Sequence, residues 1–309
     1  MITTFFRKST LINYAFSVLL LIFFFTFSQF NASTSVLNSN TIYEKALTII
    51  VLLSSLFLVN FIVKKNGLTK NSSYAILFFL LYLALFPSIF GNLKLLLANF
   101  FVILAIRRMI SLQTLKSPKE KIFDASLWIF IASLFHFWCI LFLFVIYVSI
   151  IFHVSRDYRN WLLPFIAFIT TAIIFIFSAL LFDTSWIDYI IKQSQINFQI
   201  DSFTTNFQNL ALSFYAIIAV YFLFSMVFSL TNRPLILQAS YKKMIFGFLI
   251  GLVIFLISPE KNNAILLFTF FPLAVMGTNN IEYAPSKMYQ EIVLFTVLLG
   301  CLLAFFGQL

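Results

Sequence analysis

Long apolar runs, separated by short polar or basic joints, make up most of this chain of 309 residues. Hydrophobic residues are 62% of the chain and charged residues 10%, which is too little charge for a surface that faces water. A helix of about 20 apolar residues crosses the roughly 30 Å hydrocarbon core of a bilayer. The sequence therefore predicts an all-α polytopic integral membrane protein, a single domain over 1–309 with about 10–11 transmembrane helices. The runs lie at about 11–30, 46–63, 73–90, 95–112, 122–134, 137–154, 162–182, 210–230, 244–258, 263–277 and 290–307.

The two runs between 122 and 154 follow each other without a polar joint, and His136 lies near the middle of this segment. As one helix the segment would reach about 50 Å, well beyond the thickness of a bilayer core. It must therefore bend, either within a single crossing or as a hairpin that turns near His136.

The distribution of Lys and Arg favours the hairpin, because these residues collect on the cytoplasmic side of a membrane. A single crossing would divide the 20 Lys and Arg residues into twelve and eight. The hairpin leaves sixteen on one side and only four on the other, namely Lys45, Lys94, Lys192 and Lys261. This topology predicts a multi-pass membrane protein with a cytoplasmic N-terminus and an extracytoplasmic C-terminus. It also places His136 near the extracytoplasmic surface.

Other features of the chain exclude several functions. The net charge of +10 comes from basic residues in the joints, so it indicates membrane topology and no nucleic-acid partner. Cys139 and Cys301 lie inside apolar runs without the spacing of a disulfide or a metal site. Glycine loops for phosphate and metalloprotease or hydrolase motifs are absent from the sequence. We therefore expect no cofactor and no metal.

The largest predicted outer loop, 183–210, is polar but rich in aromatic residues. Ile187, Ile190 and Ile191 have helical spacing, so part of the loop is expected to lie flat on the membrane surface. Trp186 and Tyr189 have two possible roles: they anchor the loop at the interface, or they stack on a sugar above a lipid-linked substrate.

Few residues on the predicted outer side can carry chemistry. His136 is one of two histidines, and it either caps and packs the turn or acts as a base. Asp188 and Glu260 are the other candidate bases on this side. Lys94 and Lys261 either mark helix ends or, if they meet His136 around a cleft, supply the positive charge that a diphosphate leaving group needs. The second histidine, His153, falls at the cytoplasmic end and is expected to be interfacial.

Three segments resemble the EpsG/Wzy group of bacterial polysaccharide polymerases. They are the apolar series from Lys94 to Ala98, the basic joint from Ser117 to Lys121, and the segment Ala-Ser-Leu-Phe-His that ends at His136. The resemblance covers about 94–154, and Lys94 stands where the group typically has an arginine. Lysine keeps the charge but lacks the planar fork that binds a phosphate with two hydrogen bonds.

The resemblance implies a GT-C-like scaffold and a metal-free polymerase. Such an enzyme joins undecaprenyl-diphosphate-linked oligosaccharide repeats on the extracytoplasmic side of the inner membrane, as in O-antigen, capsule or exopolysaccharide synthesis. His136 would be its catalytic base, and the substrate would meet Lys94, Lys261, Glu260, Trp186, Asp188 and Tyr189. Its expected partners are the lipid bilayer, a chain-length regulator and a flippase.

Three alternatives remain. A flippase for lipid-linked oligosaccharides, or another transporter, has a similar composition but typically shows inverted repeats or charges at the middle of the membrane, and neither is evident here. A sugar O-acetyltransferase typically has an arginine and histidine motif near its first span, which this chain lacks. A scaffold protein would need His136, Lys94 and Lys261 only for folding.

Overall fold

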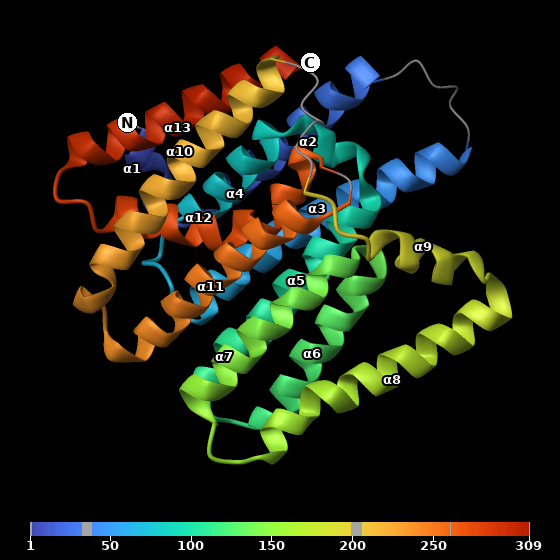
Figure 1. Ribbon diagram of the computed structural model, residues 1–309. Coiled ribbons are helices and arrows are strands. Elements are labelled where there is room, and N and C mark those ends of the chain that lie inside the picture. Colours follow the sequence, from blue (N-terminus) through green and yellow to red (C-terminus); the bar gives the residue numbers. More distant parts are fainter. Residues whose placement is uncertain (1, 33–38, 199–205, 260, 309) are drawn as a thin grey trace.

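The computed structural model describes residues 2–32, 39–198, 206–259 and 261–308. Within these ranges the chain is a bundle of α-helices joined by short 3₁₀ segments, without strands, which confirms the all-α prediction (Figure 1). The α-helices are α1 (Ile2–Phe6), α2 (Leu11–Ala32), α3 (Ser39–Lys65), α4 (Tyr74–Leu85), α5 (Leu93–Ser111), α6 (Pro118–Phe135), α7 (Leu143–His153), α8 (Arg159–Phe182), α9 (Ser185–Gln193), α10 (Asn206–Ser229), α11 (Leu235–Ile257), α12 (Leu267–Glu282) and α13 (Lys287–Gln308). The 3₁₀ segments are η1 (Pro87–Gly91), η2 (Leu112–Thr114), η3 (Phe137–Phe142), η4 (Leu230–Asn232) and η5 (Asn263–Leu266).

Eight helical segments in the described ranges are long and apolar enough to cross a membrane. They contain α2, α3, α5, α8, α10, α11, α12 and α13. The other three predicted runs are also helical but shorter or more charged, and form α4, α6 and the pair η3–α7. The protein is therefore a multi-pass membrane protein, and each predicted apolar run corresponds to a helical segment.

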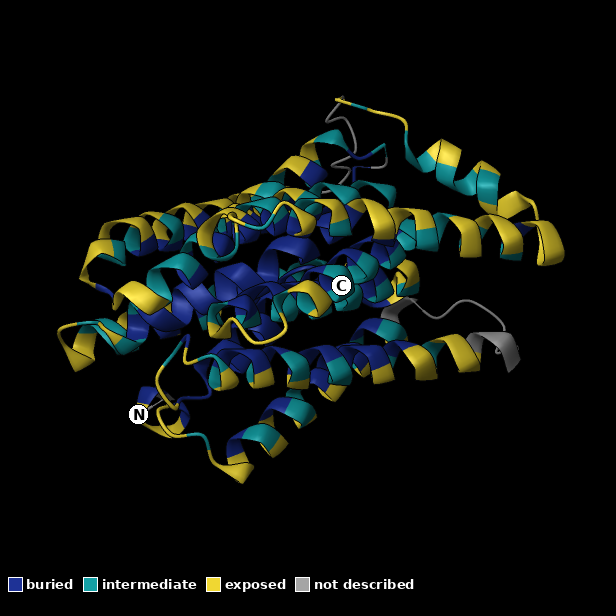
Figure 2. Ribbon diagram, turned by 90° about the horizontal axis from the view of Figure 1, so that it is seen from below, coloured by how far each residue is buried: buried dark blue, intermediate teal, exposed yellow. Residues whose placement is uncertain are grey.

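The helices α4 and α12 pack against each other in the middle of the bundle (Figure 1). Figure 2 shows that buried residues gather in this middle region, while the outer helices carry the exposed ones. Every residue of α4 is buried, as expected of a helix that is apolar on all sides. The helix ends at Leu85 because Phe86 precedes Pro87, and a residue before proline disfavours the α-helical conformation. In contrast, α8 lies at the outside beside α6 and exposes many large apolar side chains, so it is suited to face lipid.

The segment 122–154 bends at His136, as the charge distribution predicts. Helix α6 ends at Phe135, and His136 has an extended backbone with φ −144° and ψ 104°. The chain then returns through η3 and α7. Lys119 Nζ, in the first turn of α6, lies 3.2 Å from Asp157 Oδ2, just beyond α7. Because both ends of the segment meet in this ion pair, the hairpin is confirmed.

Alternation of the helices divides the charged residues between two ends of the bundle. One end, which we call the His136 end, holds Lys45, Lys94, His136, Lys192 and Lys261. The other, which we call the basic end, holds the remaining sixteen Lys and Arg residues. Contacts there include Lys70 Nζ with the carbonyl of Glu282 and Arg108 with Asp124 at 2.8 Å. This ion pair joins α6, which carries Asp124, to the end of α5.

Close packing of α11 on α12 depends on Gly251. A Cβ atom at this position would lie 2.6 Å from Thr269 Cγ2 and 3.2 Å from the backbone carbon of Phe268. One turn earlier, a Cβ at Gly247 would meet only ordinary contacts, the nearest at 3.6 Å from Pro272. We expect Gly251→Ala to lower the thermal midpoint of the purified protein through a cost of about 1–3 kcal/mol, as overpacking does. Gly247→Ala is the matched control and should leave the midpoint within a degree or two of wild type; equal midpoints for the two variants would contradict this packing.

Candidate functional site

A polar pocket of about 260 Å³ lies at the His136 end, where four parts of the chain meet. The start of α5, the turn after α6, the helix α9 and the joint between α11 and η5 each contribute to its wall. The side chains that can form hydrogen bonds in this wall are Asn92, Lys94, His136, Tyr189, Gln193 and Asn262. Lys94 and His136, two of the predicted site residues, therefore line the same cavity.

The imidazole of His136 is held by a serine. Its Nε2 atom lies 3.1 Å from Ser258 Oγ, and Ser258 donates its own hydroxyl proton to the carbonyl of Ile254 at 2.6 Å. Ser258 has one proton to give, so it accepts the bond from His136, and Nε2 carries the hydrogen. The other ring nitrogen, Nδ1, is therefore unprotonated and can accept a proton.

Burial sets the protonation state of this residue. The side chain of His136 is 7% exposed, and its ring packs against Phe268 with 5.5 Å between centroids. His136 occupies the turn between α6 and η3. Burial disfavours the charged imidazolium and lowers the pKa of the imidazole to about 4, so the ring is neutral at pH 7. An anion bound beside the ring would raise that pKa, since a negative charge favours the imidazolium.

Lys94 supplies a positive charge at the mouth of the pocket. It lies in the first turn of α5, and its Nζ atom is 4.1 Å from the centroid of the Tyr189 ring. Its ammonium makes no ion pair with any residue in the described ranges. The Tyr189 hydroxyl donates to the carbonyl of Phe135 at 3.1 Å, which holds α9 against the end of α6. Lys94 and Tyr189 thus form a cation–π pair beside His136.

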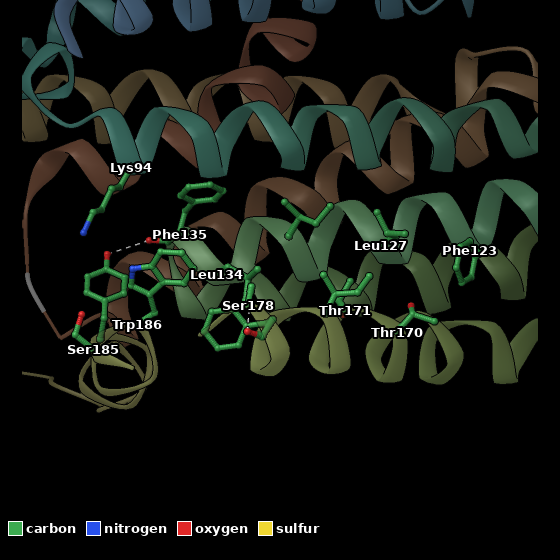
Figure 3. Close-up of a pocket in the computed structure, with 14 residues that line it drawn as sticks. Lys94, Phe123, Leu127, Leu134, Phe135, Thr170, Thr171, Ser178, Ser185 and Trp186 are labelled. Atoms are coloured by element: carbon green, nitrogen blue, oxygen red, sulfur yellow. Dashed lines mark hydrogen bonds between the residues drawn. The ribbon is translucent and has the colours of Figure 1, made fainter. Parts of the chain in front are cut away.

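An apolar groove of about 910 Å³ opens next to the polar pocket and runs between α6 and α8. Figure 3 shows Lys94, Phe135 and Trp186 at one end of the groove and Phe123 at the other. Lys94, Phe135 and Tyr189 line both cavities, so the polar pocket and the groove adjoin each other at these residues.

The other predicted site residues, apart from Tyr189, do not line the polar pocket in the described part of the chain. Lys261 is buried, but its ammonium donates to the carbonyls of Phe255 and Leu256 at the end of α11, and its side chain does not line the pocket. Lys94 and His136 therefore share the wall of this pocket, whereas Lys261, which was predicted to lie around the same cleft, is not part of that wall. Asp188 is exposed on α9 and lines neither cavity, whereas its neighbour Trp186 lines the groove. Glu260 lies outside the described residues.

Sequence reasoning missed four polar residues of the site. Asn92 and Asn262 each precede a helical segment and accept a backbone hydrogen bond from it, at 3.1 Å in both cases. An asparagine before an apolar run is a typical N-cap signal, which could have drawn attention to both. Gln193 Oε1 is buried and has no hydrogen-bond partner among the described residues, while Ser258 orients His136. Nothing in the local sequence indicates the roles of Gln193 and Ser258.

Comparison with known proteins gives a family but not an activity. A family model described as a family of unknown function, DUF6427, matches residues 5–309. The chain belongs to this DUF6427 family. No curated protein and no solved structure matches it. For this DUF6427 protein the GT-C-like scaffold and the EpsG/Wzy resemblance therefore stay predictions.

Proposed function

We propose that this DUF6427 protein is a glycan polymerase that joins polyprenyl-diphosphate-linked oligosaccharides at the membrane surface. The observation that carries the proposal is the placement of His136 and Lys94 in one pocket at the His136 end. These residues come from separate parts of the sequence, and they combine an unprotonated ring nitrogen with an ammonium that makes no ion pair among the described residues. A glycosyl transfer that releases a diphosphate needs a proton acceptor and a positive charge of this kind.

The reaction assigns a role to each group. A sugar hydroxyl of one unit attacks the anomeric carbon of another, forming a new C–O bond while the bond from that carbon to the diphosphate oxygen breaks. The hydroxyl proton passes to His136 Nδ1, and Lys94 offsets the charge that develops on the departing diphosphate. Asn92, Gln193 and Asn262 offer amide groups to the hydroxyls of the sugars.

The side of the membrane follows from the charge distribution. Sixteen of the 20 Lys and Arg residues lie at the basic end, and the positive-inside rule supports a cytoplasmic position for that end and an extracytoplasmic position for the pocket. The N-terminal helices begin at the basic end, and α13 ends at the His136 end. Transport of the lipid-linked sugar is less well supported, because apolar side chains such as Phe268, Phe270 and Phe271 fill the bundle near the pocket.

Oriented membrane vesicles that contain the protein test the activity and the side together. Right-side-out vesicles given lipid-linked repeat units on their outer face are expected to make glycans of two or more repeats, while inside-out vesicles given the same units outside make none. Gel separation of the released glycans measures chain length. Movement of the units across the membrane without any growth would support the transporter instead, and growth only in inside-out vesicles would reverse the proposed orientation.

A further inference from the structure

We infer that the groove between α6 and α8 holds the polyprenyl chain of the substrate, with its phosphate end at Lys94. The inference rests on the proposed function for the identity of the ligand. It adds a binding site for the hydrocarbon part, and it restricts the substrate to molecules that keep their lipid carrier.

The α6 wall of the groove is one continuous stripe. Phe123, Leu127, Ile131 and Phe135 all line it, and each follows the previous one by four residues. Residues with this spacing lie along one face of a helix. The stripe extends about 18 Å along the axis, at about 1.5 Å per residue, which is more than half of the roughly 30 Å bilayer core. A ligand in the groove would therefore reach from the membrane surface to beyond the middle of the bilayer.

The opposite wall, on α8, is apolar in effect although it contains three hydroxyl groups. Thr170 and Thr171 donate to the carbonyl of Ala167, each at 2.9 Å, and Ser178 donates to the carbonyl of Phe175 at 2.8 Å. Their protons are used within the helix, so the groove presents mainly methyl and methylene groups. A hydrocarbon chain suits such a surface better than a polar polymer does.

The position of the polar pocket directly beside the groove supports this choice of occupant. Lys94 and Tyr189 stand where the groove meets the pocket, and the pocket beyond them carries His136 and the amides. An occupant that fills both spaces needs a long apolar part, an anionic group at the junction and a polar part that forms hydrogen bonds. A polyprenyl-diphosphate-linked sugar has these three parts in this order.

Binding of undecaprenyl phosphate to the purified full-length protein tests the groove independently of polymerisation. Native mass spectrometry in detergent measures the bound lipid for wild type, Leu127→Trp, Thr171→Trp and Ile173→Trp. The first two variants place an indole in the groove, while Ile173 is 62% exposed on α8 and lines neither cavity. We expect the two groove variants to bind undecaprenyl phosphate at least about 10-fold more weakly than wild type, and Ile173→Trp to bind it as tightly as wild type.

A photocrosslinking amino acid covers the case in which a tryptophan variant does not fold. Placed at Ile131 it should attach to a tritium-labelled undecaprenyl phosphate, and placed at Ile173 it should not. Equal crosslinking at the two positions, or equally tight binding of phosphatidylglycerol, would overturn the inference. If wild type makes polymer and the groove variants bind undecaprenyl phosphate as tightly as Ile173→Trp does, only the groove assignment fails. If undecaprenyl phosphate occupies the groove but wild type makes no polymer, only the proposed function fails.

Discussion

Replacement of His136 by alanine is expected to reduce glycan chain growth by about 10²- to 10⁴-fold, the usual contribution of a general base. The reason is the orientation of the imidazole, since Ser258 accepts the Nε2 hydrogen and leaves Nδ1 to take the proton of the attacking hydroxyl. Cells that carry the variant should display glycan with a single repeat unit, while the protein still accumulates in the membrane. Glycan length on gels and immunoblots of the membrane fraction measure the two properties.

Two control variants separate chemistry from packing. His153→Ala removes the other histidine, which lies at the basic end beside Ser149, and should leave chain length unchanged. His136→Gln keeps an N–H donor for Ser258 but has no group that titrates, so it should be as inactive as His136→Ala. Long glycan chains in the His136→Gln strain would show that the residue only supports the turn.

Loss of the Lys94 charge is expected to have the second largest effect. Its ammonium lies at the junction of the pocket and the groove, over the Tyr189 ring, and makes no ion pair among the described residues. A hydrogen bond to a charged group contributes about 1.5–3 kcal/mol, so Lys94→Ala should lower kcat/KM by about 10- to 150-fold. Kinetics of the reconstituted protein with lipid-linked repeat units provide the measurement.

Arginine at this position should restore most of the activity, because it keeps the charge and adds a fork that binds phosphate with two hydrogen bonds. Lys192→Ala is the matched control: Lys192 also lies at the His136 end, on α9, but lines neither cavity. A drop of the same size in Lys192→Ala would mean that the general charge of this end matters and that Lys94 has no specific contact.

The helices and their alternation could be predicted because apolar length and Lys/Arg placement are local properties of the sequence. The hairpin at His136 is the clearest case. No proline or glycine interrupts 122–154, so the length of the segment indicates a bend and the distribution of Lys and Arg indicates a hairpin. The break after Leu85 was missed: the run 73–90 was predicted as one span, but Pro87 divides it into α4 and η1. That signal was present in the sequence.

The composition of the site could be predicted only in part. His136, Lys94 and Tyr189 lie together because α9 returns over the ends of α5 and α6, a contact between segments far apart in the sequence. Lys261 is as basic as Lys94, but its ammonium binds the last carbonyls of α11, a choice that depends on the path of the joint after Ile257. Gln193 and Ser258 have no local signal at all.

The sequence alone determined that this chain crosses a membrane many times and that its basic residues gather at one end. Both properties follow from the cost of placing charges and unpaired backbone groups in hydrocarbon, which acts on each segment separately. Only the tertiary structure decided which side chains share a pocket, how Ser258 orients His136, and that a groove lies between α6 and α8. These features depend on packing between helices that are distant in the chain, and the packing is set by the shapes of many side chains at once.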